Sequence, residues 1–308
     1  MIVITAPAGQ IGRQVLDNVL DNVLGNVLDG VLDGGESVRV IARDPSRLSP
    51  RVRERVEVVV GSHGDPDVVD AAFTGADSVF WLAPPNPRAE RVEDVYVEFS
   101  RPACEAFKRR GVRRAVGISA LGRGVPGNAG LVSASLAMDD LIAGTGVGYR
   151  ALTLPSFMDN MLRQVEAIRN QGVFFQPVSG DLKAPTCATR DIAAVAAGLL
   201  LDHSWSGQGE VPVLGPEDLS FEDMARIMSE VLEKPVRFQY VPVESFRDTL
   251  TRRGMSEAMA QGMADMMAAK DRGLDNAEPR TPQAGTPTTF RQWCEEILKP
   301  AVLTPVLD

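Results

Sequence analysis

A run of small residues follows the first β-branched segment of the chain and could bind phosphate. Residues 2–5 read IVIT and residues 6–12 read APAGQIG. A strand, a tight turn and a helix start gather free backbone N–H groups and a helix dipole where a pyrophosphate can bind. Gly9 would let the backbone approach the phosphates, and Gly12 would let the helix pack close to the sheet. The alternative is a tight turn that binds nothing, which the position directly after an N-terminal strand disfavours.

Arginine stands where a second contact with a dinucleotide is expected. Residues 38–42 form the second apolar run, Arg43 follows it directly, and Arg47 comes four residues later. A carboxylate at this point would accept the ribose 2′-hydroxyl of NAD, whereas a guanidinium suits the 2′-phosphate of NADP. We therefore expect NADP(H) rather than NAD(H), with a solvated arginine as the alternative.

Few side chains are available for catalysis. The three tyrosines are Tyr96, Tyr149 and Tyr240, and none has a lysine four residues later, so a Tyr-x-x-x-Lys acid–base pair is absent. The hydroxyls of Ser119 and Ser135 remain as groups that could transfer a proton. The three cysteines include no Cys-x-x-Cys pair and the chain has two histidines, so we expect no metal site.

Composition and charge exclude several classes of function. The chain has 308 residues, of which 44% are apolar and 24% charged, as is typical of a folded globular protein. A net charge of −9 without a dense run of Lys and Arg predicts no binding to nucleic acid or to anionic lipid. The longest apolar run, residues 192–201, is about half the length that spans a bilayer. The start, MIVIT, is typical of a buried strand rather than a signal peptide, so we expect a cytoplasmic protein.

Apolar runs alternate with helical patterns through the first half of the chain. The runs are residues 2–5, 38–42, 58–60, 78–82, 115–119 and 149–154. This alternation is typical of βαβ units, so we expect an α/β fold with a doubly wound parallel (Rossmann) sheet. Residues 1–155 should form this domain, joined by elements from about 187–214. Residues 156–308 should form a smaller C-terminal α/β substrate domain.

Residues 15–34 consist of five near-identical tetrapeptides, VLDN, VLDN, VLGN, VLDG and VLDG. A period of four, against 3.6 residues per turn, moves each Val-Leu pair about 40° around a helix, so one sheet face cannot bury every pair. Asn and Gly at the unit ends also weaken a helix. Two interpretations stay open: an expansion that lengthens or breaks the first helix, or a protruding part that packs on a partner subunit in a homodimer.

Several further motifs occur in a characteristic order. Ala6-x-x-Gly9-x-x-Gly12 corresponds to a GxxGxxG pattern, and the second strand continues as VRVIARDPSRL. Other matching segments are LAP at 82–84, ISALG at 118–122, LPSFMDN at 154–160, TRDIA at 189–193 and TPTT at 286–289. With these motifs the chain resembles the NmrA-like family of atypical short-chain dehydrogenases/reductases over nearly its whole length.

The resemblance implies NADP(H) in a cleft between a Rossmann domain and a small substrate domain. The cofactor-binding residues that follow from it and from the motifs above are Thr5, Ala8, Gly9, Gln10, Ile11, Gly12, Arg43, Arg47, Ser62, His63, Leu82, Ala83, Pro84, Pro155 and Phe157. His63 stands near the usual adenine contact, where it either meets the nucleotide or is an exposed loop residue. Ala6 replaces the first glycine, which is tolerable while its φ is negative, and Pro7 lacks an N–H that could face phosphate.

Two functions stay open. The first is an NADP(H)-dependent oxidoreductase that reduces a small hydrophobic carbonyl, enone or quinone, an activated acceptor that needs little acid catalysis. Its proton would come from water, Ser119 or Ser135. The second is a catalytically silent NADP(H) redox sensor that reports to a partner protein. The missing Tyr-x-x-x-Lys favours the sensor and the complete substrate domain favours the enzyme, which we prefer. Methionines at 255, 259, 263, 266 and 267 are either adaptable core or the wall of a pocket for a bulky apolar ligand.

Overall fold

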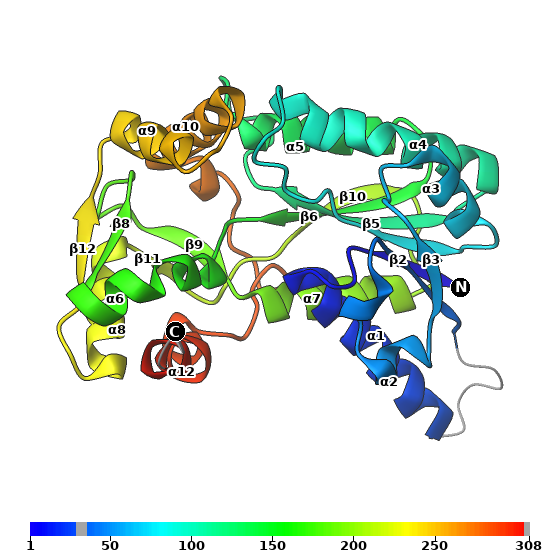
Figure 1. Cartoon of the computed structure of the whole chain (residues 1–308), viewed down its shortest axis with the longest axis horizontal. Helices are drawn as coiled ribbons and strands as arrows, with labels where there is room; N and C mark the ends of the chain where they lie inside the picture. The colour runs from blue at the N-terminus through cyan, green and yellow to red at the C-terminus, as the bar shows by residue number, and fades with distance from the viewer. Residues whose placement is uncertain (29–35, 305–308) are drawn as a thin grey trace.

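The computed structural model describes residues 1–28 and 36–304, and its larger unit is built on a seven-stranded sheet (Figure 1). All paired strands of this sheet run parallel. In spatial order they are β3 (Glu57–Val60), β2 (Val38–Ala42), β1 (Ile2–Thr5), β4 (Ser78–Trp81), β5 (Arg114–Ala120), β6 (Gly148–Leu154) and β10 (Gln208–Pro212). The order 3-2-1-4-5-6 reverses direction beside β1, as in doubly wound dinucleotide-binding folds. The predicted Rossmann fold is confirmed.

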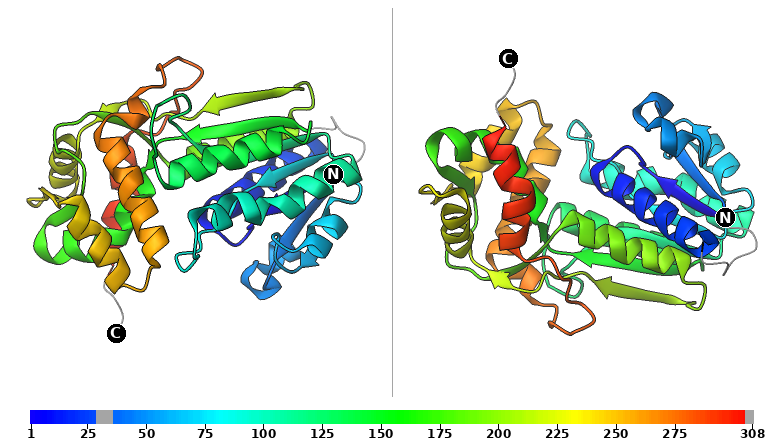
Figure 2. Two further views of the ribbon diagram at one scale, coloured as in Figure 1. Left: turned by 90° about the horizontal axis from the view of Figure 1, so that it is seen from above. Right: turned by 90° about the horizontal axis from the view of Figure 1, so that it is seen from below.

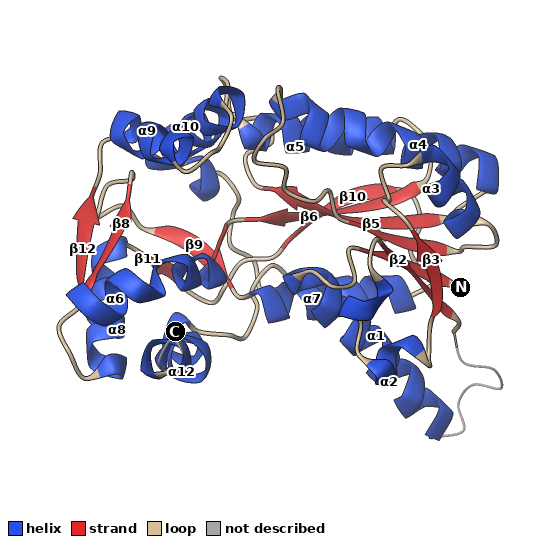
Figure 3. Cartoon of the chain, viewed as in Figure 1, coloured by secondary structure: helices blue, strands red, loops and turns tan. Residues whose placement is uncertain are grey.

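Helices cover both faces of this sheet (Figure 3). One face carries α1 (Gln10–Leu28), α2 (Pro50–Arg53) and α7 (Thr189–Leu201), and the other carries α3 (Pro66–Phe73), α4 (Phe99–Arg110) and α5 (Leu131–Ala143). Because both faces are covered, the strands are almost continuously apolar and buried.

The smaller unit has two short sheets and a core of its own. One sheet contains β7 (Ser156–Phe157), β9 (Ala184–Cys187) and β11 (Asp218–Leu219), and the other contains β8 (Val173–Gln176) and β12 (Arg237–Tyr240). Its helices are α6 (Val165–Gln171), α8 (Phe221–Leu232), α9 (Val243–Arg252), α10 (Glu257–Asp271), α11 (Phe290–Trp293) and α12 (Lys299–Leu303). Between β9 and β11 the chain returns to the larger unit, where α7 packs on α1 and β10 pairs with β6. The domain boundary at 155 stays a prediction.

The tetrapeptide repeat forms most of helix α1. Val15, Leu16, Val19 and Leu20 are buried in the core that α1 shares with α7, and Figure 2 shows these two helices side by side. The helix continues to Leu28, so the repeat lengthens it. Residues 29–34 of the repeat lie outside the described residues, and its packing on a partner subunit stays a prediction.

Across residues 1–28 and 36–304, the helices are too short or too polar to serve as membrane-spanning segments.

Candidate functional site

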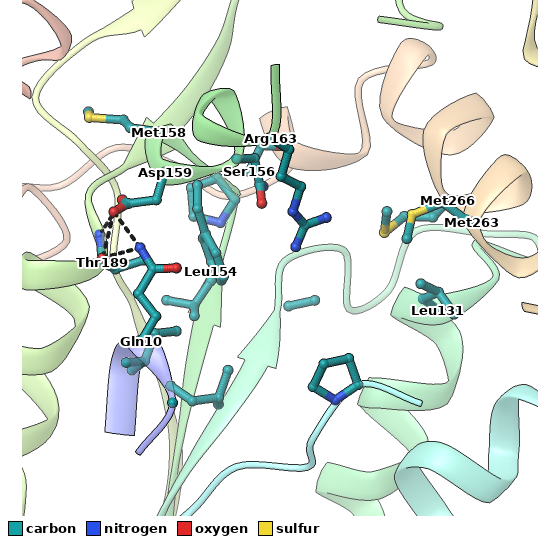
Figure 4. A pocket seen from close by; sticks show the side chains of 18 of the residues that line it. Gln10, Leu131, Leu154, Ser156, Met158, Asp159, Arg163, Thr189, Met263 and Met266 are labelled. Carbon is teal, nitrogen blue, oxygen red and sulfur yellow. Dashed lines mark hydrogen bonds between the residues drawn. The ribbon is translucent and has the colours of Figure 1, made fainter. Parts of the chain in front are cut away.

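A cavity of about 1500 Å³ lies between the two units, along the carboxyl ends of the central strands. This edge is where ligands bind in open α/β sheets. From the larger unit, the cavity is lined by the β1–α1 turn and by residues at or just after the ends of β2, β4, β5 and β6. From the smaller unit, it is lined by the 3₁₀ segment Met158–Gln164 and by methionines of α10 (Figure 4). The volume exceeds the 300–1,000 Å³ of ordinary small-molecule pockets.

The β1–α1 turn has the close packing that the glycine pattern predicts. The Gly9 N–H donates to the Ala6 carbonyl oxygen at 2.9 Å, which closes the turn. A Cβ added at Gly12 would lie 2.2 Å from the same oxygen, so only glycine fits. Helix α1 has no acidic residue in its first turn to compete with a bound anion. The turn therefore fits a pyrophosphate, with Pro7 contributing no N–H.

Ala6 has a φ of +50°, in the left-handed region. The condition for an alanine without strain at this residue, a negative φ, is therefore not met. An alanine in this region is strained by about 1 kcal/mol, because its Cβ crowds the following carbonyl. The strain has a local reason: the left-handed residue turns the chain sharply, so that helix α1 can start over the end of β1.

Two exposed guanidinium groups lie at the end of the cavity beside β2. Arg43 and Arg47 both line the cavity, and neither forms an ion pair within residues 1–28 and 36–304. The neighbouring carboxylate of Asp44 instead accepts bonds from the Ser46 N–H at 3.0 Å and the Ser46 hydroxyl at 2.6 Å. The hydrogen bonds from Ser46 lower the pKa of Asp44. The positive charge at this end is thus available to a ligand, and Asp44, which also lines the cavity, has one carboxylate oxygen bonded to Ser46.

His63 is buried and lines the same part of the cavity. Its Nε2 lies 3.0 Å from the Leu82 carbonyl oxygen, and its ring packs edge-on against Trp81 and Phe99. Burial lowers the pKa of His63, so the ring is neutral at pH 7 and Nε2–H donates to the carbonyl. The alternative of an exposed loop residue is wrong.

Two residues predicted to contact the cofactor do not line the cavity. The Thr5 hydroxyl donates to the Phe80 carbonyl at 2.9 Å and accepts from the Leu82 N–H at 3.1 Å, which ties β1 to β4. The Ser62 hydroxyl accepts from the Gly64 N–H at 3.2 Å. The Thr5 hydroxyl thus ties two strands together, and the Ser62 hydroxyl stabilises its own loop. The contact of these two residues with a cofactor stays a prediction.

The structure brings the other predicted residues together around one cavity. Those that line it are Ala8, Gly9, Gln10, Ile11, Gly12, Arg43, Arg47, His63, Leu82, Ala83, Pro84, Pro155 and Phe157, with Ser119 and Ser135 further along. Their contacts with a cofactor or substrate stay predictions.

A polar clamp joins the two units beside the turn (Figure 4). Gln10 of α1 donates its side-chain amide to Asp159 Oδ1 at 2.7 Å. Asp159 also accepts the Thr189 N–H at 3.0 Å and the Thr189 hydroxyl at 2.9 Å. Asp159 and Thr189 were not predicted as site residues, although both stand in motifs that carry the family resemblance.

A buried carboxyl group lies behind Ser119. The Ser119 hydroxyl donates to Asp139 Oδ2, and the Tyr149 hydroxyl donates to Asp139 Oδ1 at 2.7 Å. Burial outweighs these bonds and raises the pKa of Asp139 to about 6. Neither Asp139 nor Tyr149 was predicted from the sequence as a site residue. The available signal was the spacing of four from Ser135 to Asp139, which puts both on one side of α5.

The other half of the cavity has an apolar wall with one guanidinium near it. Met263 and Met266 of α10 face Leu131 of α5 (Figure 4), and Met255 and Met267 also line the cavity, whereas Met259 is buried in the core. Figure 4 shows the Arg163 side chain directed into the space between Ser156 and these methionines. Within the part of the chain that the structure describes, Arg163 has no carboxylate partner.

The fold and this cavity define a two-unit α/β protein of the dinucleotide-binding class. The chain belongs to the NAD(P)H-binding family, whose model matches residues 8–203. The model of the NmrA-like family matches residues 146–293, so the resemblance inferred from the motifs is confirmed.

Individual relatives and solved structures agree with this assignment. The chain is 28% identical over 303 residues to a (4-alkanoyl-5-oxo-2,5-dihydrofuran-3-yl)methyl phosphate reductase of Streptomyces griseus, covering 96% of this chain and 97% of the relative. It shares its fold with Citrobacter sp. triphenylmethane reductase complexed with NADP(H), with a TM-score of 0.78, 18% identity, and 98% and 100% of the two chains covered. For an NADPH-dependent quinone oxidoreductase of Escherichia coli the TM-score is 0.76, at 22% identity and with 95% and 98% covered.

Proposed function

We propose that this protein is an NADPH-dependent reductase of a small hydrophobic carbonyl, enone or quinone. The observation that carries the proposal is one continuous cavity of about 1500 Å³ with two differently built halves. The first half, here called the cofactor half, has the β1–α1 turn and two arginines, Arg43 and Arg47, that form no ion pair in the part of the chain that the structure describes. The second half has an apolar wall that a sensor of the cofactor alone would not need.

NADPH is favoured over NADH by the charges around the second strand. Arg43 and Arg47 offer guanidinium groups to a 2′-phosphate, and they outnumber Asp44, the neighbouring acid that also lines the cavity and has one carboxylate oxygen bonded to Ser46. The two solved relatives named above were crystallised with NADP(H) and with NADPH.

Different residues around the cavity contribute to binding the cofactor, binding the acceptor and transferring the proton in such a reduction. NADPH, when bound, supplies a hydride to the acceptor. The β1–α1 turn binds the pyrophosphate, and Pro84 and Pro155 line the cavity just after the ends of β4 and β6. The methionine wall excludes water and adapts its shape to the acceptor. Ser119 stands near the end of β5 and lines the cavity, so its hydroxyl can meet the reacting end of an acceptor.

The acceptor is expected to be conjugated, because hydride transfer to it then needs little acid catalysis. The names of the Streptomyces, Citrobacter and Escherichia relatives describe reduction of an unsaturated lactone, a triphenylmethane and a quinone. Arg163 adds one refinement. A guanidinium that forms no ion pair within residues 1–28 and 36–304, beside an apolar wall, suits an acceptor that carries a phosphate or carboxylate on an apolar body.

The test begins with calorimetric titration of the purified protein with NADPH and NADH. Quinones and enones are then screened by following NADPH absorbance, using matched acceptors with and without a phosphate ester. We expect tight NADPH binding, weak NADH binding, and turnover that favours the phosphorylated member of a pair. Tight binding without turnover of any acceptor would support the redox sensor instead, and no binding of either nucleotide would overturn both functions.

A further inference from the structure

The carboxyl group of Asp139 forms part of a buried hydrogen-bonded set that touches the cavity at a single hydroxyl. Asp139 is 2% exposed and does not line the cavity, whereas Ser119, its hydrogen-bond partner, does. The second carboxylate oxygen accepts from Tyr149, which is also buried. The three side chains come from α5, β5 and β6. They form a continuous path of hydrogen bonds from the interior to the reacting end of the cavity.

The surrounding backbone is built to accommodate this set. A Cβ at Gly117 would lie 2.2 Å from the Tyr149 hydroxyl oxygen, so glycine at that residue leaves the room in which Tyr149 reaches Asp139. Asp139 stands four residues after Ser135, which also lines the cavity. The two residues have the same spacing as a Tyr-x-x-x-Lys pair, with the hydroxyl of Ser135 in place of tyrosine and the acid Asp139 in place of lysine.

We propose that Asp139 stores the proton for the reduction and that Ser119 passes it to the acceptor. The inference rests on the proposed reductase function and specifies its proton step. As the hydride arrives at the acceptor, the Ser119 O–H bond breaks and its proton bonds to the acceptor oxygen. When Asp139 is protonated, its Oδ2–H donates to Ser119 Oγ, the reverse of the bond that the carboxylate accepts. This proton moves to Ser119 Oγ at the same time as the Ser119 O–H bond breaks. Asp139 is left as a carboxylate, hydrogen-bonded to Tyr149, and regains a proton from water before the next turnover.

The charges around Asp139 suit a group that cycles between the two protonation states. Arg123, which is partly exposed, lies 3.8 Å from Asp139 Oδ2 and also pairs with Asp140 and with Glu210 of β10. Tyr149 faces Asp139 from β6, and Cys104 of α4 lies near the Tyr149 hydroxyl. Burial raises the pKa of Asp139, while Ser119, Tyr149 and Arg123 oppose that rise, so the pKa is about 6. Both states are therefore accessible near neutral pH.

The deciding experiment compares two acceptors that differ in their need for a proton. A quinone takes up a hydride and a proton, whereas a cationic triarylmethane dye takes up a hydride alone and becomes neutral. With the quinone, kcat of the wild type should fall about tenfold per pH unit above pH 6, and kcat for the dye should stay level. Asp139→Asn should lower kcat for the quinone at pH 6 by about 100-fold and abolish its pH dependence, and it should change kcat for the dye less than threefold.

Tyr149→Phe serves as the matched variant that keeps the acid. Removing this donor removes one bond that favours the carboxylate, so the fall in kcat for the quinone should begin at a higher pH. Equal losses with quinone and dye in Asp139→Asn, or an unshifted profile in Tyr149→Phe, would overturn the relay and leave the reductase function intact. A wild type that reduces no acceptor would instead overturn the reductase function and, with it, the relay.

A measurement without cofactor tests the acid itself. Folding raises the pKa of Asp139 above its ordinary value, so the native state binds the proton more tightly than the unfolded chain does. The free energy of unfolding of the wild type should therefore fall relative to that of Asp139→Asn as pH rises from about 4 to about 7, and the difference should be constant above that. Urea unfolding at a series of pH values measures it. If the difference in the free energy of unfolding between wild type and Asp139→Asn does not change with pH, the proposal that Asp139 holds the proton is wrong, whether or not the enzyme is active.

Discussion

The two halves of the cavity are built in different ways. The cofactor half consists mainly of backbone and of residues close together in the chain, the turn 6–12 and the segment that contains Arg43 and Arg47. The acceptor half combines single side chains from distant segments, among them Ser119, Arg163 and Met263. A dinucleotide is a fixed ligand that backbone N–H groups can bind in any such fold, whereas an acceptor is recognised by side chains that can be exchanged singly. The first half is therefore constrained by backbone geometry and the second by packing.

The substitution that we expect to weaken cofactor binding and stability most adds one methyl group at the β1–α1 turn. Gly12→Ala would bring a Cβ to 2.2 Å from the Ala6 carbonyl oxygen, and backbone cannot move aside as a flexible side chain can. We expect NADPH binding by calorimetry to weaken at least tenfold and the free energy of unfolding to fall by about 3 kcal/mol.

Gly198→Ala is the control, because this glycine lies inside helix α7 with nothing within 4 Å of its added Cβ. The control should raise the free energy of unfolding by about 0.5–1 kcal/mol and leave NADPH binding unchanged. Similar behaviour of the two variants would mean that the turn is not under steric constraint.

The charge at the other end of the cofactor half should determine which nucleotide binds. Arg43→Ala removes one charge-assisted contact with a 2′-phosphate, worth about 1.5–3 kcal/mol, so NADPH binding should weaken roughly 10- to 150-fold. NADH lacks that phosphate and should bind as before. Arg53→Ala, outside the cavity, is the matched control and should change neither affinity. Equal weakening of NADPH and NADH in Arg43→Ala would contradict the 2′-phosphate assignment.

The clamp at Asp159 tests whether the two halves depend on each other. Asp159→Ala removes the acceptor of the Gln10 amide and leaves the buried start of α7 at Thr189 without its side-chain cap. We expect the free energy of unfolding to fall by about 1–2 kcal/mol and the KM for the acceptor to rise, because the smaller unit loses its tie to the turn. Glu230→Ala, on exposed ion pairs of the smaller unit outside the cavity, should change the free energy of unfolding and the KM by much less. A loss of stability without any change in KM would show that the acceptor half is positioned independently.

The difference between the halves also explains what sequence reasoning could predict. The strands, the turn and Arg43 follow from local patterns, because periodicity and glycine spacing act between neighbours in the chain. Asp139 and Tyr149 were missed, because they meet Ser119 only through the pairing of β5 with β6 and the packing of α5. Thr5 does not line the cavity for a related reason: its hydroxyl finds partners at β4, which is distant in sequence. Contacts within a segment can be predicted from residue types, whereas contacts between segments need the fold.

The smallest expected effect concerns the strained residue of the turn itself. Ala6 has a φ of +50°, so Ala6→Gly relieves about 1 kcal/mol of strain. The added freedom of glycine in the unfolded chain offsets roughly half of that gain, so the free energy of unfolding should rise by about 0.5 kcal/mol. Ala8 lies two residues later and has a negative φ, so Ala8→Gly has no strain to relieve. This substitution should lower the free energy of unfolding by about 0.5 kcal/mol. Urea unfolding of the two variants therefore gives shifts of opposite sign if the strain lies at Ala6, and shifts of the same sign if the turn relaxes around either residue.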